Sequence, residues 1–185
     1  MKYRKVLPHV FFAILVGVFV LLNNSGLNSS LKQSKIIQPS STSNQVSTTK
    51  ETAQVLRVVD GDTIEVSLNN KKETIRLIGI DSPETLDPRK PVQCFGIEAS
   101  NKAKKTLNGK TVGLETDPTQ GERDKYGRLL RYVFLNDLNF NKLMISEGFA
   151  HEYTYQNNPY KYQLDFIQAA KEARENNRGL WQKCV

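Results

Sequence analysis

The stretch QVLRVVDGDTIEVSLNNKKETIRLIGI, residues 54–80, predicts three short β-strands joined by two turns. In its central part, TIEVSL, apolar and polar residues alternate, which is the period of two expected for a strand with one buried face. DGD and NNKK are turn sequences, because Asp, Asn and Gly tolerate the backbone conformations of tight turns. Further strands are predicted at KTVGLET, residues 110–116, and at RLLRYVFL, residues 128–135. Five short strands with few long gaps predict a small curled sheet or barrel.

Three helical stretches interrupt or follow the strands. Each has a glycine near its end, Gly109, Gly148 or Gly179, in a position that suits a helix C-terminus. In the third stretch the spacing of Leu164 and Ile167 indicates a helix packed on one side only. The fold class predicted is therefore α+β. The three stretches are FGIEASNKAKKTL (95–107), NFNKLMISEGF (139–149) and YQLDFIQAAKEAREN (162–176).

The N-terminal region has the composition of an export signal and a linker. Lys2, Arg4 and Lys5 precede the apolar run VFFAILVGVFVLL, residues 10–22, which matches a signal-peptide core and is short for a spanning helix. We therefore expect residues 1–29 to be a signal peptide or an uncleaved N-terminal membrane anchor. The Ser-, Thr-, Asn- and Gln-rich residues 30–53 are expected to form a disordered linker.

The folded domain is expected over residues 54–185, in a protein that is secreted or extracellular, or that is held at the membrane through residues 10–22. The chain of 185 residues carries a formal net charge of +7. Such a surplus suits a polyanion or an anionic surface, and it also occurs on ordinary solvated faces.

The counts of cysteine and histidine narrow the chemistry. Cys94 and Cys184 are the two cysteines, with no C-x-x-C motif, so a structural zinc site is not expected. In an exported chain this pair suggests one disulfide that closes a loop of about 90 residues, and two free thiols are the alternative. His151 is the one histidine of the expected domain, which excludes mechanisms that need two histidines as acid and base or three as zinc ligands.

Three polar clusters could carry chemistry or could simply form turns: DGDT (60–63), DSPE (81–84) together with Arg76, and RDKYGR (123–128). Arg76 and Asp81 are five residues apart and would point to opposite faces of a regular strand. For both to line one site the strand must gain a residue, and Gly79 is where a bulge is most easily formed. A regular strand at Gly79 would count against a shared site.

The residue types in these clusters suit cleavage of a phosphodiester bond. Asp62, Asp81 and Glu84 offer hard oxygen ligands, which favour Ca²⁺ or Mg²⁺ over zinc or copper. Arg76 and Arg128 could grip a phosphate and stabilise the charge that develops on it. A carboxylate beside a metal-bound phosphate could orient or deprotonate the attacking water.

The motifs VVDGDTIEV, IRLIGIDSPET, RDKYGRLLRYVF and the terminal GLW together resemble the thermonuclease family, the staphylococcal nuclease-like secreted nucleases. The resemblance covers residues 54–185 and implies a five-stranded OB-fold β-barrel with three α-helices. It also implies a Ca²⁺-dependent endonuclease and exonuclease that hydrolyses the 5′ P–O bond of DNA and RNA and leaves 3′-phosphate ends.

By motif position the resemblance implies a catalytic and a metal-binding set. Glu84 matches the general base, or the group that holds the attacking water. The metal ligands are expected to be Asp62, Asp81 and the backbone carbonyl of Ser82, and the two phosphate-binding arginines are expected to be Arg76 and Arg128. Ser82 stands where the family has threonine, which changes little if its carbonyl is the ligand.

The same resemblance implies a substrate-binding set. Lys125 and Tyr126 match residues that contact the phosphate of the terminal nucleotide, and Tyr153 and Tyr155 match tyrosines that line the base pocket. The alignment is looser around HEYTYQNNPYKY, so that Tyr160 or Tyr162 could take one of these places. The segment LDPRKPVQCFG and the cysteine pair depart from the family pattern, which leaves the shape of the loop beside the site open.

Two other functions compete with the nuclease. A non-catalytic OB-fold module could bind nucleic acid at the cell surface without cutting it. An extracellular scaffold domain could use its acidic turns to bind Ca²⁺ structurally. Single-stranded or frayed DNA and RNA are the partners expected for the enzyme, and no protein partner is inferred.

Overall fold

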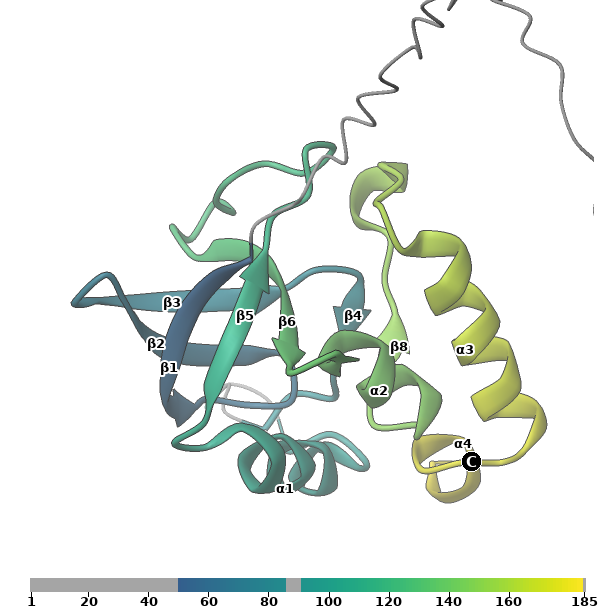
Figure 1. Cartoon of the computed structure of the whole chain (residues 1–185). Coiled ribbons are helices and arrows are strands. Elements are labelled where there is room, and N and C mark those ends of the chain that lie inside the picture. Colours follow the sequence, from purple (N-terminus) through teal and green to yellow (C-terminus); the bar gives the residue numbers. More distant parts are fainter. Residues whose placement is uncertain (1–49, 86–90, 185) are drawn as a thin grey trace, which may run out of the picture. The chain divides into compact units, whose positions relative to one another are not determined.

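The computed structural model describes residues 50–85 and 91–184 (Figure 1). The expected leader, residues 1–29 with the apolar run at 10–22, and nearly all of the expected linker lie outside the described residues. Within the described ranges, no helix is both long enough and apolar enough to cross a membrane.

A five-stranded barrel forms the centre of the domain. Its strands β1, β2, β3, β5 and β6 follow the order β3-β2-β1-β5-β6, and a parallel pairing of β3 with β6 closes the sheet on itself. The other pairings among the described strands are antiparallel. The predicted OB-type barrel is confirmed. The strands are β1 (Glu51–Val58), β2 (Thr63–Leu68), β3 (Lys71–Leu77), β4 (Ile80–Asp81), β5 (Thr111–Glu115), β6 (Leu129–Leu135), β7 (Leu138–Asn139) and β8 (His151–Glu152).

The first strand extends beyond the predicted domain boundary. β1 begins at Glu51, three residues before residue 54, because its first residues pair with β5. Thr52 lies opposite Gly113, and Ala53, which is only 2% exposed, lies opposite Val112. Ala53 is the one apolar residue among residues 51–54, so that the sequence shows no alternation there that would predict a strand.

The helices cover one end and one side of the barrel (Figure 1). The three predicted helices are confirmed, and a short fourth helix and a 3₁₀ turn are added. Phe166 and Ala173 of α3 are fully buried, whereas Leu164 is 83% exposed. The packed face of α3 therefore differs from the one predicted around Leu164 and Ile167. The helical elements are α1 (Gly96–Leu107), α2 (Phe140–Ser146), η1 (Tyr155–Asn157), α3 (Gln163–Glu175) and α4 (Leu180–Lys183).

Aromatic packing explains which face of α3 is buried. The ring of Phe166 lies between the rings of Tyr132, at 6.2 Å, and Tyr160, at 5.6 Å. Tyr132 lies on β6, so that its ring contact with Phe166 joins α3 to the barrel. Exposing the large aromatic ring of Phe166 to water would cost more free energy than exposing Leu164 and Ile167 does.

Two further links fix the elements that carry the functional residues. Asn141 of α2 is fully buried; its side-chain amide nitrogen donates to the carbonyl of Ile78, and its oxygen accepts from the backbone N–H of Val133. Cys94 and Cys184 form the expected disulfide, with Cα atoms 5.8 Å apart. The first link holds the turn that follows β3, and the second ties the start of α1 to the C-terminal segment.

Candidate active site

The turn after β3 brings Arg76 and Asp81 to the same side. β3 ends at Leu77 and β4 begins at Ile80, and between them Gly79 adopts a φ of 77°. A Cβ at this position would lie 2.7 Å from the ring of Tyr160. The irregularity predicted at Gly79 is therefore present, as a tight turn and not as a bulge within a continuous strand.

Arg76 links this turn to the acidic residues. Its Nη1 donates to the carbonyl oxygens of Leu77 and Ile80, each at 2.8 Å. Its Nη2 lies 3.2 Å from Oδ1 of Asp81 and 3.3 Å from Oδ2 of Asp62. One guanidinium thus stabilises the turn and brings two carboxylates from different motifs together.

The DGD turn packs directly against Ser82. Oδ2 of Asp62 accepts a 2.7 Å hydrogen bond from the backbone N–H of Ser82, and Oδ1 accepts from the Thr63 hydroxyl. Asp62 is only 6% exposed. A Cβ on Gly61 would lie 2.6 Å from the Cβ of Ser82, so that the close approach of the two turns requires glycine.

The acidic side chains of this region repel one another. Burial, with the neighbouring charge of Asp62, raises the pKa of Asp60 to about 7. Burial also raises the pKa of Asp81; Asp62 adds to this effect, Arg76 opposes it, and Glu84 contributes the smallest part. The site therefore holds more negative charge than Arg76 balances.

The RDKYGR segment is organised around Asp124, whose part the sequence did not indicate. Oδ1 of Asp124 accepts from the backbone N–H groups of Tyr126 and Arg128, and Oδ2 accepts from Nε of Arg128 at 2.7 Å. Although burial opposes ionisation, these hydrogen bonds hold the pKa of Asp124 below its usual range. Asp124 thus fixes the direction of Arg128. An aspartate three residues before a glycine, Asp124 before Gly127, is the turn signal that could have indicated this.

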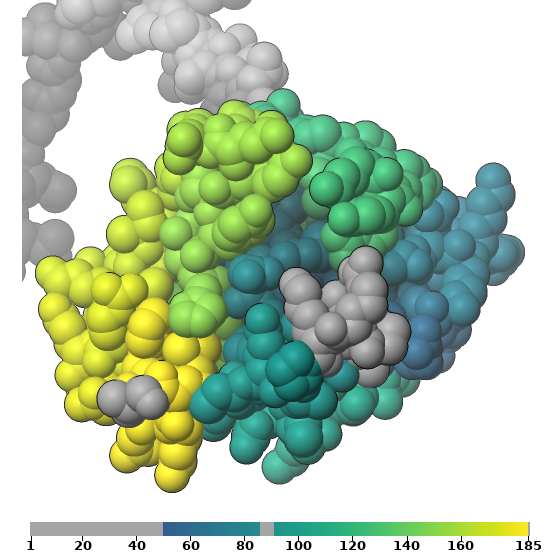
Figure 2. All heavy atoms as spheres, turned by 180° about the vertical axis from the view of Figure 1, so that it is seen from behind, coloured from purple at the N-terminus to yellow at the C-terminus, as the bar shows by residue number. Residues whose placement is uncertain are grey.

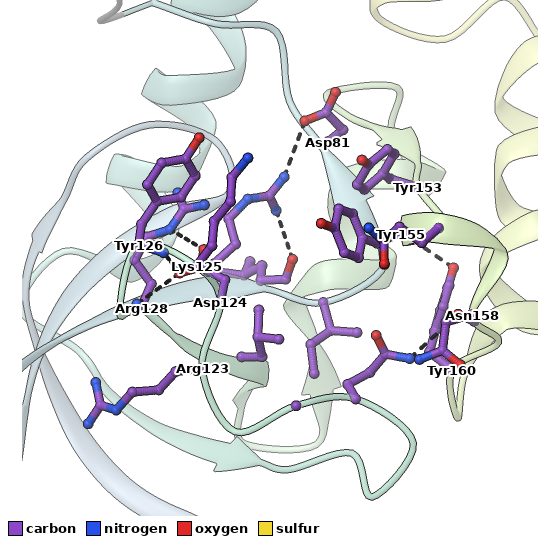
Figure 3. Close-up of a pocket in the computed structure, with 18 residues that line it drawn as sticks. Asp81, Arg123, Asp124, Lys125, Tyr126, Arg128, Tyr153, Tyr155, Asn158 and Tyr160 are labelled. Carbon is purple, nitrogen blue, oxygen red and sulfur yellow. Dashed lines mark hydrogen bonds and ion pairs between the residues drawn. The ribbon is translucent and has the colours of Figure 1, made fainter.

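A cavity of about 550 Å³ collects most of the predicted residues. Figure 3 shows Lys125, Tyr126 and Arg128 on one side and Tyr153 and Tyr155 on the other. In the space-filling view, residues near 120 and residues near 155 flank this hollow (Figure 2). Arg76 and Asp81 also line it.

The four candidate tyrosines have different environments. Tyr153 and Tyr155 are 43% and 50% exposed and line the cavity. Tyr160 also lines it but is buried, and its hydroxyl donates to Glu152. Tyr162 packs its ring against Tyr132 at 4.7 Å and donates its hydroxyl to a buried glutamate. The rings available to a ligand are thus those of Tyr153 and Tyr155.

The segment that carries Tyr153 and Tyr155 is attached to the turn between β3 and β4. β8 pairs with β4, so that His151 lies opposite Asp81, and the backbone N–H of Tyr153 donates to the carbonyl of Gly79 at 3.0 Å. The relative position of the rings and the acidic residues is therefore set by main-chain hydrogen bonds.

Glu84 does not line the cavity. It follows Ser82 and Pro83 and lies against the segment that enters α1. Its backbone N–H donates to Oε1 of Gln93 at 2.8 Å, and the backbone N–H of Gln93 donates to the Glu84 carbonyl at 2.9 Å. Oε1 of its carboxylate accepts from the backbone N–H of Thr85 at 2.8 Å.

The donor set of the site is suited to a hard cation. The described residues contain no group of three or more His, Cys, Asp or Glu side chains that could hold a metal ion. They do contain two carboxylates, Asp62 and Asp81, each within 3.3 Å of the same nitrogen atom, with the backbone of Ser82 beside them. An oxygen-only set of this kind fits Ca²⁺ or Mg²⁺ and does not fit zinc.

Comparison with known proteins finds related sequences over the folded domain. A family model described as staphylococcal nuclease homologue matches residues 74–183. Thermonuclease of Staphylococcus hyicus is 43% identical over 132 residues, which cover 71% of this chain and 76% of that protein. Thermonuclease of Staphylococcus intermedius is 44% identical over 133 residues, covering 72% and 77%. Endonuclease YncB of Bacillus subtilis (strain 168) is 39% identical over 128 residues, covering 69% and 60%.

Proposed function

This chain belongs to the family of staphylococcal nuclease homologues and is a nuclease that hydrolyses phosphodiester bonds. On that premise we propose that it is a Ca²⁺-dependent extracellular enzyme that cleaves DNA and RNA and leaves 3′-phosphate ends. The observation that carries the proposal is the meeting of Arg76, Arg128 and Asp81 at one cavity, with Asp62 joined to Arg76.

The two arginines are assigned to the scissile phosphate. Arg76 lies at the end of β3 and Arg128 immediately before β6, and the closing pairing places Ile75 opposite Leu129. The two guanidinium groups therefore approach the cavity from neighbouring strands. Guanidinium forks match phosphate oxygens and stabilise the charge that builds up on them as the bond breaks.

Glu84 is assigned to the attacking water. Its carboxylate removes a proton from the water, whose oxygen attacks phosphorus as the bond to the 5′ oxygen breaks. The leaving 5′ oxygen takes up a proton from solvent, so that the products are a 3′-phosphate and a 5′-hydroxyl. Bound Ca²⁺, held by Asp62, Asp81 and the Ser82 carbonyl, would supply positive charge next to the phosphate.

The rest of the cavity is assigned to a single strand. Lys125 places its ammonium 5.0 Å from the centre of the Tyr126 ring, so that a cation and an aromatic ring lie next to each other. Across the cavity the exposed rings of Tyr153 and Tyr155 lie 6.3 Å apart. Aromatic rings stack on bases that are not paired, which supports a preference for single-stranded or frayed DNA and RNA.

Degradation assays test this function. Purified protein is incubated with single-stranded DNA and with RNA, in Ca²⁺ or in chelator, and the product ends are identified by their response to a 3′-phosphatase. We expect Ca²⁺-dependent cleavage, and a loss on the order of a hundredfold in Arg128→Ala and in Glu84→Gln. Arg57→Ala, which removes an exposed arginine paired with Glu65, is the matched control and retains the rate.

Two outcomes would contradict the proposal. Intact strands that are merely retarded on a gel would favour a nucleic-acid-binding module, and cleavage unaffected by the chelator would exclude Ca²⁺ dependence. A folded Arg128→Ala protein with normal activity would remove Arg128 from the mechanism.

Export is proposed from the N-terminal composition and from the disulfide. A disulfide persists in oxidising compartments, which supports a location outside the cytoplasm. Residues 1–29 would be removed as a signal peptide or kept as an anchor. Cell fractionation with mass determination separates these two forms, and an intact chain recovered in the cytoplasm would contradict export.

A further inference from the structure

The segment that enters α1 is fastened to Glu84 by main-chain and side-chain contacts. Gln93 both accepts from the Glu84 N–H and donates to the Glu84 carbonyl, so that the Glu84 backbone is held at both its polar atoms. The carbonyl of Gln93 in turn accepts from the N–H of Gly96, the first residue of α1. Glu84 is therefore coupled to the helix start through one glutamine.

The first residue of α1 packs tightly against the same stretch. A Cβ on Gly96 would lie 2.7 Å from Cγ2 of Thr85 and 3.1 Å from the carbonyl oxygens of Pro83 and Glu84. There is no room for a side chain at Gly96. The helix start thus forms a close-fitting support for residues 83–85.

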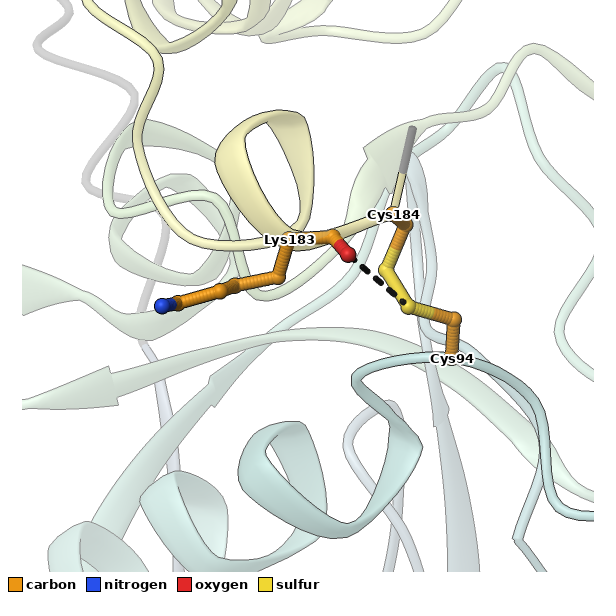
Figure 4. The surroundings of a disulfide bond; sticks show 3 residues. All are labelled: Cys94, Lys183 and Cys184. Atoms are coloured by element: carbon orange, nitrogen blue, oxygen red, sulfur yellow. Dashed lines mark hydrogen bonds between the residues drawn. A yellow bond between two sulfur atoms is a disulfide. The ribbon is translucent and has the colours of Figure 1, made fainter.

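The disulfide attaches this support to the C-terminal part of the domain. Cys94, which follows Gln93, is bonded to Cys184 (Figure 4). The N–H of Cys184 donates to the carbonyl of Leu180, and the N–H of Leu180 donates to the carbonyl of Gly148. Leu180 is only 4% exposed. In Figure 2 the C-terminal segment lies against the start of α1.

We propose that Gln93 is a positioning residue for Glu84, and that the Cys94–Cys184 disulfide holds Gln93 in place, so that the cleavage rate depends on the redox state of this pair. The proposal rests on the role proposed above for Glu84. A base that removes a proton from water must be held within a fraction of an ångström, and small displacements cost large factors in rate.

A double-mutant cycle tests the positioning role. Gln93→Ala should lower kcat about tenfold and change KM less than twofold, because the substrate contacts are intact. In a Glu84→Gln background the same change should have an effect below twofold, because no base remains to be positioned. Gln93→Glu keeps an oxygen that can accept from the Glu84 N–H and should recover most of the rate.

The matched control is Gln168→Ala. Gln168 also makes one side-chain hydrogen bond, to Glu172, but lies on the outer side of α3. This variant should retain the wild-type kcat. If Gln93→Ala lowers the rate equally in both backgrounds, or if it has no effect in the wild-type background, the positioning role is wrong.

The disulfide is tested with the Cys94→Ala/Cys184→Ala protein and with wild-type protein reduced by dithiothreitol, at a temperature where circular dichroism shows the folded state. In both, kcat should fall severalfold, and in a Glu84→Gln background it should not change further. A full rate in folded, reduced protein would overturn the redox dependence.

The outcomes separate this inference from the proposed function. Normal activity in Glu84→Gln would refute the role of Glu84 itself. A large loss in Glu84→Gln together with unchanged Gln93 variants would refute only the positioning role. The Gln93 cycle keeps the disulfide intact, so that it decides this role even if the reduced protein unfolds.

Discussion

Replacing Arg76 or Arg128 with alanine should remove similar amounts of activity but very different amounts of stability. Both side chains line the cavity. The Arg76 side chain is 14% exposed, donates to the carbonyls of Leu77 and Ile80, and lies beside the buried Asp62. The Arg128 side chain is 28% exposed and is bound mainly to Asp124.

The magnitudes follow from these contacts. Arg76→Ala removes two charged hydrogen bonds to the backbone, and it leaves the buried carboxylate of Asp62 without its cation. We expect a loss of about 3–5 kcal/mol in the free energy of unfolding. Arg128→Ala breaks one partly exposed ion pair, for which we expect a loss of about 1 kcal/mol. Each variant should lose on the order of a hundredfold in kcat through weaker stabilisation of the phosphate charge.

Urea unfolding gives the free energy of unfolding and initial rates give kcat, both on the same protein samples. Trp181, the single tryptophan of the chain, contacts His151 and Arg174 and reports unfolding by its fluorescence. Rates are measured on single-stranded DNA at a temperature where both variants are folded. Equal losses of stability in the two variants would refute the structural part assigned to Arg76.

Three further predictions concern the turn, one buried carboxylate and the disulfide. Gly79→Ala should lower the free energy of unfolding by about 2–3 kcal/mol and also reduce the cleavage rate, because Gly79 has a φ of 77° and an added Cβ would lie 2.7 Å from a tyrosine ring. The control is Gly109→Ala, where φ is 68° but the space is open. It should lower the free energy of unfolding by about 1 kcal/mol and leave the rate unchanged. Burial would raise the pKa of Asp117, but hydrogen bonds from two backbone amides and two hydroxyls outweigh it and lower this pKa below 3.8. The ionised side chain therefore stabilises the folded state fully above the unfolded pKa, and this stabilisation is lost as the pH falls through the folded pKa. Thermal unfolding should therefore show Asp117→Asn less stable than the wild type at pH 7, with a difference that narrows below about pH 4; a constant difference would contradict this. Removing the Cys94–Cys184 disulfide, which spans 90 residues, should cost up to about 4 kcal/mol in urea unfolding, and an unchanged midpoint would show that the unfolded chain gains little freedom.

The barrel could be predicted from the sequence because its signals are local. Alternation in TIEVSL and the DGD and NNKK turns indicate strands without knowledge of their partners. The parity of Arg76 and Asp81 also predicts that a site shared by both needs an irregularity in the strand, which is most easily formed at Gly79. Its form could not be predicted, because the turn is shaped by Tyr160 and Phe166, which lie about 80 residues away in the chain.

Other features depended on long-range packing that leaves no local pattern. The buried face of α3 is selected by Tyr132 on β6, so that Phe166 and not Leu164 faces inward. Likewise the contact of Gln93 with Glu84 crosses nine positions of the chain and has no sequence period. The motifs predicted that Arg76, Asp81 and Arg128 meet at one cavity, whereas the residues that hold them in place emerged from the structure.

The parallel pairing of β3 with β6 has a consequence for the newly synthesised chain. This seam joins Ile75 to Leu129 and Arg76 to Leu130, pairs more than fifty positions apart. Contacts at such separation form late, because the entropy of closing a long loop must be met before they contribute. Arg76 and Arg128 are brought together as this seam forms, so that a partly folded chain lacks the pair of arginines proposed here to bind the phosphate. We therefore expect the nuclease activity to appear only once the pairing of β3 with β6 has formed.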